Sequence, residues 1–281
     1  MILVTGASGT MGREVVRALT GHRVRVLVRD PARLREVPAH VQVVRGDYGD
    51  SASLIPALTG VSSAFLVTNR VTHEDDAAFV GAARACGVGH VVKLSAAAVT
   101  DSGADDLITR WQRGTELLLR GSGLGWTLLR PRAFMSNTLS WAPSVRTGRA
   151  VRTLFVTARN ACVDPRDVAE VAARALTGEG HAGRAYTLTG PRALTPTEQA
   201  AELGRQLGRQ LAVEELSLDA ARTQLRRRHP PAVVEALIDS ACRQREETKA
   251  AVSPTVAELL GRPARSYTEW VGDHLGAFRT A

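Results

Sequence analysis

Three glycines near the start of the chain, Gly6, Gly9 and Gly12, have the spacing of a dinucleotide-binding turn. They follow an apolar run at residues 2–4 and precede a stretch with helical apolar spacing at residues 13–19. In a strand–turn–helix unit, the first glycine permits the bend, the second lets the backbone approach a pyrophosphate, and the third lets helix pack on strand. The anion then lies at a helix N-terminus. The pattern alone also fits an ordinary tight turn.

The end of the second apolar run, residues 23–28, bears on the choice between NADH and NADPH. An acidic residue there would bind the ribose hydroxyls of NAD, whereas an arginine would pair with the 2′-phosphate of NADP. Arg29 and Asp30 are both present. Because Asp30 precedes Pro31, it suits a helix N-cap, which leaves Arg29 as the phosphate ligand. The sequence therefore favours NADPH.

Further polar residues follow the predicted strands at 41–44, 64–67 and 90–94. Parallel strands present their carboxyl ends at one edge, where ligands bind. Asp47 suits either an adenine ribose or the cap of a helix at residues 51–58. The predicted cofactor-binding residues are Gly6, Ser8, Gly9, Thr10, Met11, Arg29, Asp47, Tyr48, Thr68, Asn69 and Ala96.

The catalytic candidates are Ser95 and His181. Ser95 follows the strand at residues 90–94 and would orient a carbonyl or relay a proton, or else cap the strand end. Thr68 is a second hydroxyl with a weaker claim. His181 has a suitable pKa for an acid, although a histidine in a Gly-rich loop is more often simply exposed. Lys93 lies within a buried strand and is better explained as a paired structural residue.

Large apolar side chains gather around a sixth predicted strand at residues 126–129, in a chain with only 4% aromatic residues. They suggest the wall of a pocket for a flat, ring-containing substrate, with core packing as the alternative for each one. The predicted substrate-binding residues are Trp111, Phe134, Met135, Trp141 and Phe155.

Strands that alternate with helical segments predict an α/β fold: a Rossmann-type, doubly wound parallel sheet with a small, mainly helical C-terminal lobe that covers the substrate. We expect an NADP-binding domain at residues 1–155. The C-terminal part, residues 156–281, returns a strand near 160–164, a helix from Pro165 and a strand at 186–189, followed mainly by helices.

The composition excludes several classes of protein. Three distant cysteines, Cys86, Cys162 and Cys242, predict reduced thiols rather than a disulfide or zinc framework, and hence a cytoplasmic protein. No apolar run is long enough for a membrane helix. The net charge of +8 comes almost entirely from arginine, which is typical of GC-rich coding sequences such as those of actinobacteria. We therefore expect no nucleic-acid partner, no membrane partner and no metal.

The motifs resemble those of the short-chain dehydrogenase/reductases, in particular their atypical NmrA-like branch. The resemblance spans nearly the whole chain and is carried by T-G-x-x-G-x-x-G at 5–12, V-R-D-P at 28–31, S-G-L-G-W-T-L-L-R-P at 122–131, F-M-x-N at 134–137, V-D-P-R-D-V-A at 163–169, Y-T-L-T-G-P at 186–191 and Y-T-E-W at 267–270. It implies a Rossmann core, a small C-terminal lobe and bound NADPH. The chain departs from the superfamily in one respect, because it contains no Tyr-x-x-x-Lys pair.

The resemblance implies an NADPH-dependent oxidoreductase, and we expect a ketoreductase acting on a bulky aromatic polyketide in antibiotic biosynthesis, similar to angucyclinone ketoreductases. Without the Tyr-x-x-x-Lys pair, a phenol of the substrate would supply the proton. Two alternatives suit the missing pair equally well. One is a quinone reductase, whose product anion needs little acid catalysis, and the other is a non-catalytic NADP-sensing regulator. The sequence leaves open whether the protein is a monomer or a homodimer.

Overall fold

The computed structural model describes residues 1–34 and 38–279, which divide into two compact units. Unit 1 comprises residues 1–99, 109–130 and 165–187. Unit 2 comprises residues 100–108, 131–164 and the chain from 188 onward. The units interleave along the sequence, so no single boundary, at residue 155 or elsewhere, separates them.

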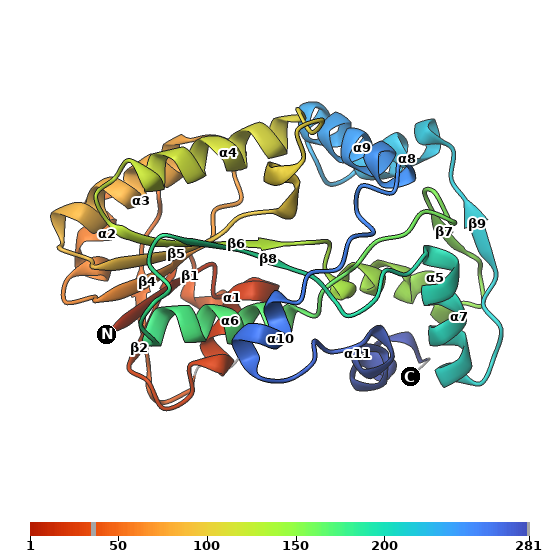
Figure 1. Ribbon diagram of the computed structural model, residues 1–281, viewed down its shortest axis with the longest axis horizontal. Helices are drawn as coiled ribbons and strands as arrows, with labels where there is room; N and C mark the ends of the chain where they lie inside the picture. Colours follow the sequence, from red (N-terminus) through yellow and green to blue (C-terminus); the bar gives the residue numbers. More distant parts are fainter. Residues whose placement is uncertain (35–37, 280–281) are drawn as a thin grey trace. The chain divides into compact units, whose positions relative to one another are not determined.

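Unit 1 is built on a seven-stranded sheet in the part of the chain that the structure describes (Figure 1). The strand order is β3-β2-β1-β4-β5-β6-β8, and the five pairs from β3 to β6 are parallel. Because the order reverses direction between β1 and β4, a crevice forms at the carboxyl ends of these strands, where nucleotides bind. The strands are β1 (Ile2–Thr5), β2 (Val24–Val28), β3 (Val41–Arg45), β4 (Ser63–Leu66), β5 (His90–Leu94), β6 (Gly125–Pro131) and β8 (Arg184–Leu188).

Helices cover both faces of this sheet, which confirms the predicted Rossmann-type fold (Figure 1). On one face, α2 (Ser51–Leu58), α3 (Glu74–Ala85) and α4 (Leu107–Arg120) bury leucines and Phe79 against Leu3, Leu66 and Leu128 of the strands. On the other face, α1 (Thr10–Ala18) packs on α6 (Pro165–Thr177). The central strands are buried along their whole length, as expected for a parallel sheet with two covered faces.

Unit 2 is mainly helical, with a small parallel sheet of β7 (Val151–Thr153) and β9 (Val213–Glu215). Its apolar core includes Met135, Leu203, Tyr267 and Trp270. Pro230 is the N-cap of α9, so the Pro230–Pro231 pair lies where α8 and α9 are separated. The helices are α5 (Ala142–Arg146), α7 (Pro196–Leu207), α8 (Leu218–Leu225), α9 (Pro231–Arg245), α10 (Thr255–Leu260) and α11 (Tyr267–His274).

One predicted strand is wrong. Within the described chain, residues 160–164 form only isolated bridges, Asn160 with Leu194 and Phe134 with Val163, so this stretch is not a strand of a sheet. The strands β7 and β9 are too short to give a period-two signal in the sequence. Among the described residues, no helix combines the length and apolar character needed to cross a bilayer.

Candidate functional site

The glycine turn between β1 and α1 has the close packing that its spacing predicts. Gly6 has a positive φ of 65°, which favours glycine. A Cβ atom on Gly12 would lie 2.2 Å from the carbonyl oxygen of Gly6, so only glycine fits where α1 meets the turn. Gly9 donates its N–H to the same carbonyl at 2.9 Å. Gly6 and Gly12 therefore set the position at which α1 begins.

The N-terminus of α1 is suited to a phosphate group. Its N-cap, Gly9, offers no side chain to cap the helix, and no acidic residue lies in the first turn. Ser8, Gly9 and Thr10 are all exposed. The first-turn N–H groups and the positive end of the helix dipole thus face outward without a competing carboxylate. This open cradle fits the pyrophosphate of a dinucleotide.

A cavity of about 390 Å³ lies over this turn and is lined by residues of unit 1. The lining extends from the glycine turn to the ends of β2, β3 and β4. The predicted cofactor-binding residues that line it are Gly6, Ser8, Gly9, Thr10, Met11, Arg29, Asp47, Tyr48 and Asn69. Thr68 and Ala96 are not part of this lining. Arg33 and the Arg70–Asp75 ion pair also border the cavity, and the sequence did not single them out.

At the end of β2, Asp30 forms the cap that the Asp-Pro pair predicts. Asp30 caps the short helix at Pro31–Arg33 by accepting a hydrogen bond from the Ala32 amide at 3.0 Å. Arg29 is exposed and lines the cavity. Its guanidinium therefore remains available for an anion, whereas Arg33 lies 3.9 Å from the Asp30 carboxylate.

Asp47 does not cap the helix at residues 51–58, because Asp50 does so by accepting from the Ala52 amide. The Asp47 carboxylate instead accepts from the Gly49 amide at 2.8 Å and borders the cavity. Tyr48 donates its hydroxyl to the Val67 carbonyl at 2.8 Å, and burial raises the pKa of this phenol above its usual value. The Tyr48 hydroxyl is thus neutral, and its proton is used in the hydrogen bond to Val67.

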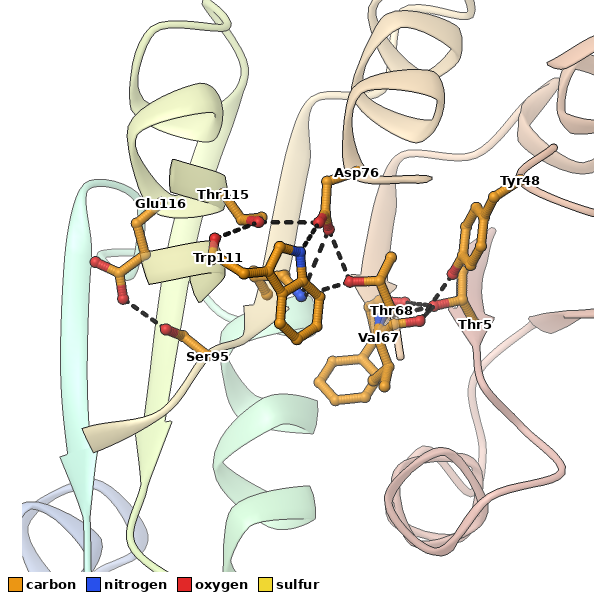
Figure 2. Close-up of polar contacts among 11 residues, drawn as sticks. Thr5, Tyr48, Val67, Thr68, Asp76, Ser95, Trp111, Thr115 and Glu116 are labelled. Carbon is orange, nitrogen blue, oxygen red and sulfur yellow. Dashed lines mark hydrogen bonds and ion pairs between the residues drawn. The ribbon is translucent and has the colours of Figure 1, made fainter. Parts of the chain in front are cut away.

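The carboxylate of Asp76, which lies on α3, contacts side chains from the segment after β4, from β5 and from α4 (Figure 2). One oxygen accepts from the Thr68 hydroxyl at 2.8 Å and lies 3.6 Å from the Lys93 ammonium. The other accepts from the Trp111 indole at 2.8 Å and the Thr115 hydroxyl at 2.9 Å. Lys93 also donates to Thr68, and burial lowers its pKa, which the nearby Asp76 carboxylate opposes. Lys93 is therefore a paired structural residue.

Ser95 is also committed to a buried carboxylate (Figure 2). Its hydroxyl donates to Glu116 at 2.7 Å. Arg130 donates to both oxygens of the same carboxylate. The Ser95 proton is therefore held by Glu116, and only its oxygen lone pairs remain to orient another group.

His181 lies near the amino ends of the strands, whereas the glycine turn lies at their carboxyl ends. Its ring hydrogen-bonds to the Tyr186 hydroxyl at 2.9 Å, and its carbonyl accepts from Thr127. Thr127 in turn contacts His90, the first residue of β5, whereas ligands bind at the carboxyl ends. Burial lowers the pKa of His181, so its ring is neutral near pH 7. His181 therefore lies away from the carboxyl ends of the strands that border the candidate site.

The predicted aromatic wall divides between two units. Phe134, Trp141 and Phe155 line one cavity of about 400 Å³ within unit 2. Met135 is buried in the unit 2 core, and Trp111 belongs to the Asp76 network of unit 1. For Met135 and Trp111, the alternative of core packing therefore applies.

The same cavity contains neutral polar groups that the sequence did not single out. Asn160 is 5% exposed, and its side-chain oxygen has no hydrogen-bond partner among the described residues. Its amide nitrogen donates to Gln244 at 3.1 Å. Cys162 also lines the cavity, and burial raises the pKa of its thiol to about 11, so the thiol is neutral. The Asn160 oxygen is thus an unused buried acceptor at this cavity.

Comparison with known proteins agrees with this geometry. Residues 6–179 match the family model described as NAD(P)H-binding. A (4-alkanoyl-5-oxo-2,5-dihydrofuran-3-yl)methyl phosphate reductase of Streptomyces griseus is 55% identical over 279 residues, which are 99% of each chain. An NAD(P)H azoreductase of Xenophilus azovorans is 35% identical over 288 residues, with full coverage of both chains. The structure of an Escherichia coli NADPH-dependent quinone oxidoreductase in complex with NADPH has a TM-score of 0.85 at 30% identity, covering 97% of this chain and 99% of that one.

The chain belongs to the NAD(P)H-binding, NmrA-like branch of the short-chain dehydrogenase/reductases. It is an NAD(P)H-dependent oxidoreductase, which sets aside the alternative of a non-catalytic sensor. The glycine turn, the uncapped α1 N-terminus and Arg29 are the groups that fit NADPH.

Substitutions of two glycines are expected to separate folding from cofactor binding. Gly12→Ala should lower the free energy of unfolding by about 1–3 kcal/mol, because its Cβ would overlap the Gly6 carbonyl. Gly9→Val should leave a folded protein, since Gly9 has a negative φ of −89° and the nearest contact of a Cβ is 3.3 Å away. It should nevertheless abolish NADPH binding, because the side chain would occupy the cradle. Denaturant unfolding and calorimetric titration measure the two effects. Normal NADPH affinity in folded Gly9→Val would show that the turn is not a cofactor site.

Arg29→Ala tests the cofactor preference. Loss of a charge-assisted contact should raise the Kd for NADPH about 10- to 100-fold and leave the Kd for NADH nearly unchanged. Arg33→Ala provides the comparison, because Arg33 borders the same cavity beside Asp30. Equal losses for NADPH and NADH in Arg29→Ala would contradict the assignment of Arg29 to the 2′-phosphate.

Proposed function

We propose that this protein is an NADPH-dependent reductase that saturates the ring double bond of a butenolide phosphate. The substrate class is that named for the Streptomyces griseus relative, a (4-alkanoyl-5-oxo-2,5-dihydrofuran-3-yl)methyl phosphate. In this compound the double bond joins C3, which carries the phosphorylated methyl group, to C4, which carries the alkanoyl group. Both the C5 lactone carbonyl and the alkanoyl carbonyl are conjugated with it.

The observation that carries the proposal is that the hydroxyl groups near the strand ends already donate hydrogen bonds to other groups of the protein. Tyr48 donates to Val67, Thr68 to Asp76 and Ser95 to Glu116. The chain also lacks the Tyr-x-x-x-Lys pair. A protein with this arrangement is suited to a reaction that needs no strong protein acid.

Conjugate reduction of the butenolide is such a reaction. When bound, NADPH supplies a hydride, which adds to C3 and converts the cofactor to NADP⁺. The electron pair of the double bond moves to C4, where the two carbonyls share the negative charge as an enolate. This anion is a weak base, so water can protonate C4 afterwards. A simple ketone would instead give an alkoxide, which requires an acid during hydride transfer.

The chain contributes chiefly binding and position. The glycine turn and α1 hold the pyrophosphate, and Arg29 holds the 2′-phosphate. The Asp76 network fixes Thr68 at the end of β4, and the Glu116–Arg130 pair fixes Ser95 at the end of β5. The oxygen of Ser95 then serves as a positioning group. In unit 2, the cavity bordered by Phe134, Trp141 and Phe155 accepts the uncharged body of the substrate.

Two other substrate classes are the alternatives to this proposal. A quinone is favoured by the 30% identity with the Escherichia coli quinone oxidoreductase, and its product anion is also stabilised. The aromatic polyketide ketone expected from the sequence would require a phenol of the substrate as the acid. Neither requires a protein donor, but the 55% identity over 99% of both chains favours the butenolide.

The position of a transferred deuterium distinguishes these reactions. With NADPH deuterated at its transferable position, the butenolide phosphate should yield a saturated lactone carrying deuterium at C3, as seen by NMR. Ser95→Ala should slow turnover by about tenfold and leave the label at C3, because one positioning group is lost. Deuterium on the side-chain carbinol carbon would identify a ketoreductase. Turnover of quinones or aromatic ketones alone would exclude the butenolide.

A further inference from the structure

Three segments of unit 2 meet beside the Asn160 cavity and bring together three basic side chains. The Ala161 amide donates to the carbonyl of Lys249 at 3.0 Å, and the Val163 amide donates to that of Ala133 at 2.9 Å. Ala133 and Cys162 both line the cavity. The basic residues at this junction are Arg132, Arg243 and Lys249.

Only one of these three cations is neutralised by carboxylates. Arg243 pairs with Asp106 at 2.5 Å and with Asp101 at 3.5 Å. Arg132 is half-buried, its buried Nε has no hydrogen-bond partner, and no carboxylate of the described residues forms an ion pair with it. Among the described residues, Lys249 donates only to the carbonyl and hydroxyl oxygens of Ser240, at 2.7 and 2.9 Å.

The environment of the two uncompensated cations is unfavourable without an anion. The pKa of Lys249 is lowered to about 8, first by burial and then by the nearby charges of Arg243 and Arg132, whereas Asp106 and Cys162 oppose this shift. Burial likewise lowers the pKa of Arg132, which the more distant Asp101 carboxylate opposes without forming an ion pair with it. Adjacent buried charges of one sign are costly unless an opposite charge joins them.

Donors remain available on both side chains. An ammonium has three N–H donors and Lys249 uses two of them on Ser240, which leaves one. The guanidinium of Arg132 presents its planar fork, which matches the geometry of phosphate oxygens. The nearby Cys162 thiol is neutral and does not compete for the cations.

We propose that Arg132 and Lys249 form a subsite beside the unit 2 cavity that binds the phosphate monoester of the substrate. This inference rests on the proposed function, which supplies a substrate with a phosphorylated methyl group. The cavity, whose one lining arginine, Arg152, is paired with Glu214, then holds the rest of the molecule. The two cations select the phosphorylated form over the free alcohol.

Kinetics with the butenolide phosphate and the matching hydroxymethyl butenolide test the subsite. The wild type should prefer the phosphate, mainly through KM. In Arg132→Gln and Lys249→Gln, KM for the phosphate should rise about 10- to 100-fold, with little change for the alcohol. Arg132→Lys should restore part of the preference. Arg205→Gln, which removes an exposed arginine paired with Glu202, serves as the control and should leave both substrates unaffected.

A binding measurement separates this inference from the proposed function. Inorganic phosphate is titrated into the protein saturated with NADP⁺, so that the cofactor phosphate sites are filled. It should raise the Tm of the wild type and of Arg205→Gln, but not of Arg132→Gln. If the wild type reduces neither butenolide, the proposed function fails and this titration alone decides whether the cation pair binds phosphate. Equal reduction of phosphate and alcohol, or equal losses on both in Arg132→Gln, would overturn the subsite.

Discussion

The buried carboxylate of Asp76 is the interaction on which the candidate site in unit 1 depends. It neutralises Lys93, which has no exposed surface, and accepts hydrogen bonds from Thr68, Trp111 and Thr115. These contacts join the end of β4 to β5, α3 and α4. Removal of one partner of a buried pair costs about 3–5 kcal/mol, because the other charge stays buried. The network thus fixes the strand ends beside the cofactor cavity. It also holds the hydroxyl proton of Thr68 in a hydrogen bond to Asp76.

Much of the fold followed from local signals in the sequence. The glycine spacing places α1 on β1, because Gly6 needs a positive φ and Gly12 has no room for a side chain. Continuous apolar runs correctly predicted a parallel sheet covered on both faces. The Asp30–Pro31 pair predicted a cap, which the structure confirms. The stretch at 160–164 misled because its three central apolar residues give no information about a pairing partner, and it forms only two isolated bridges with other described residues.

The site was less predictable, because its partners are distant in sequence. Asp76 resembles a surface acid at a helix start, yet its spacing to Phe79, Val80 and Ala83 places it on the buried helical face, and this signal was available. Ser95 and Thr68 were expected as candidate catalytic hydroxyls, but the acids that hold them, Glu116 and Asp76, lie on α4 and α3. The direction of their protons depends on tertiary packing.

These committed hydroxyls lead to the central claim that hydride transfer proceeds without a protein acid. Single turnovers with the butenolide phosphate, using deuterated or ordinary NADPH in H₂O and in D₂O, test it directly. The account predicts a clear isotope effect from deuterated NADPH on the hydride step, no solvent isotope effect on that step, and the same pattern in Ser95→Ala. A solvent isotope effect on hydride transfer that disappears in Ser95→Ala would contradict it, because Ser95 would then deliver a proton in that step.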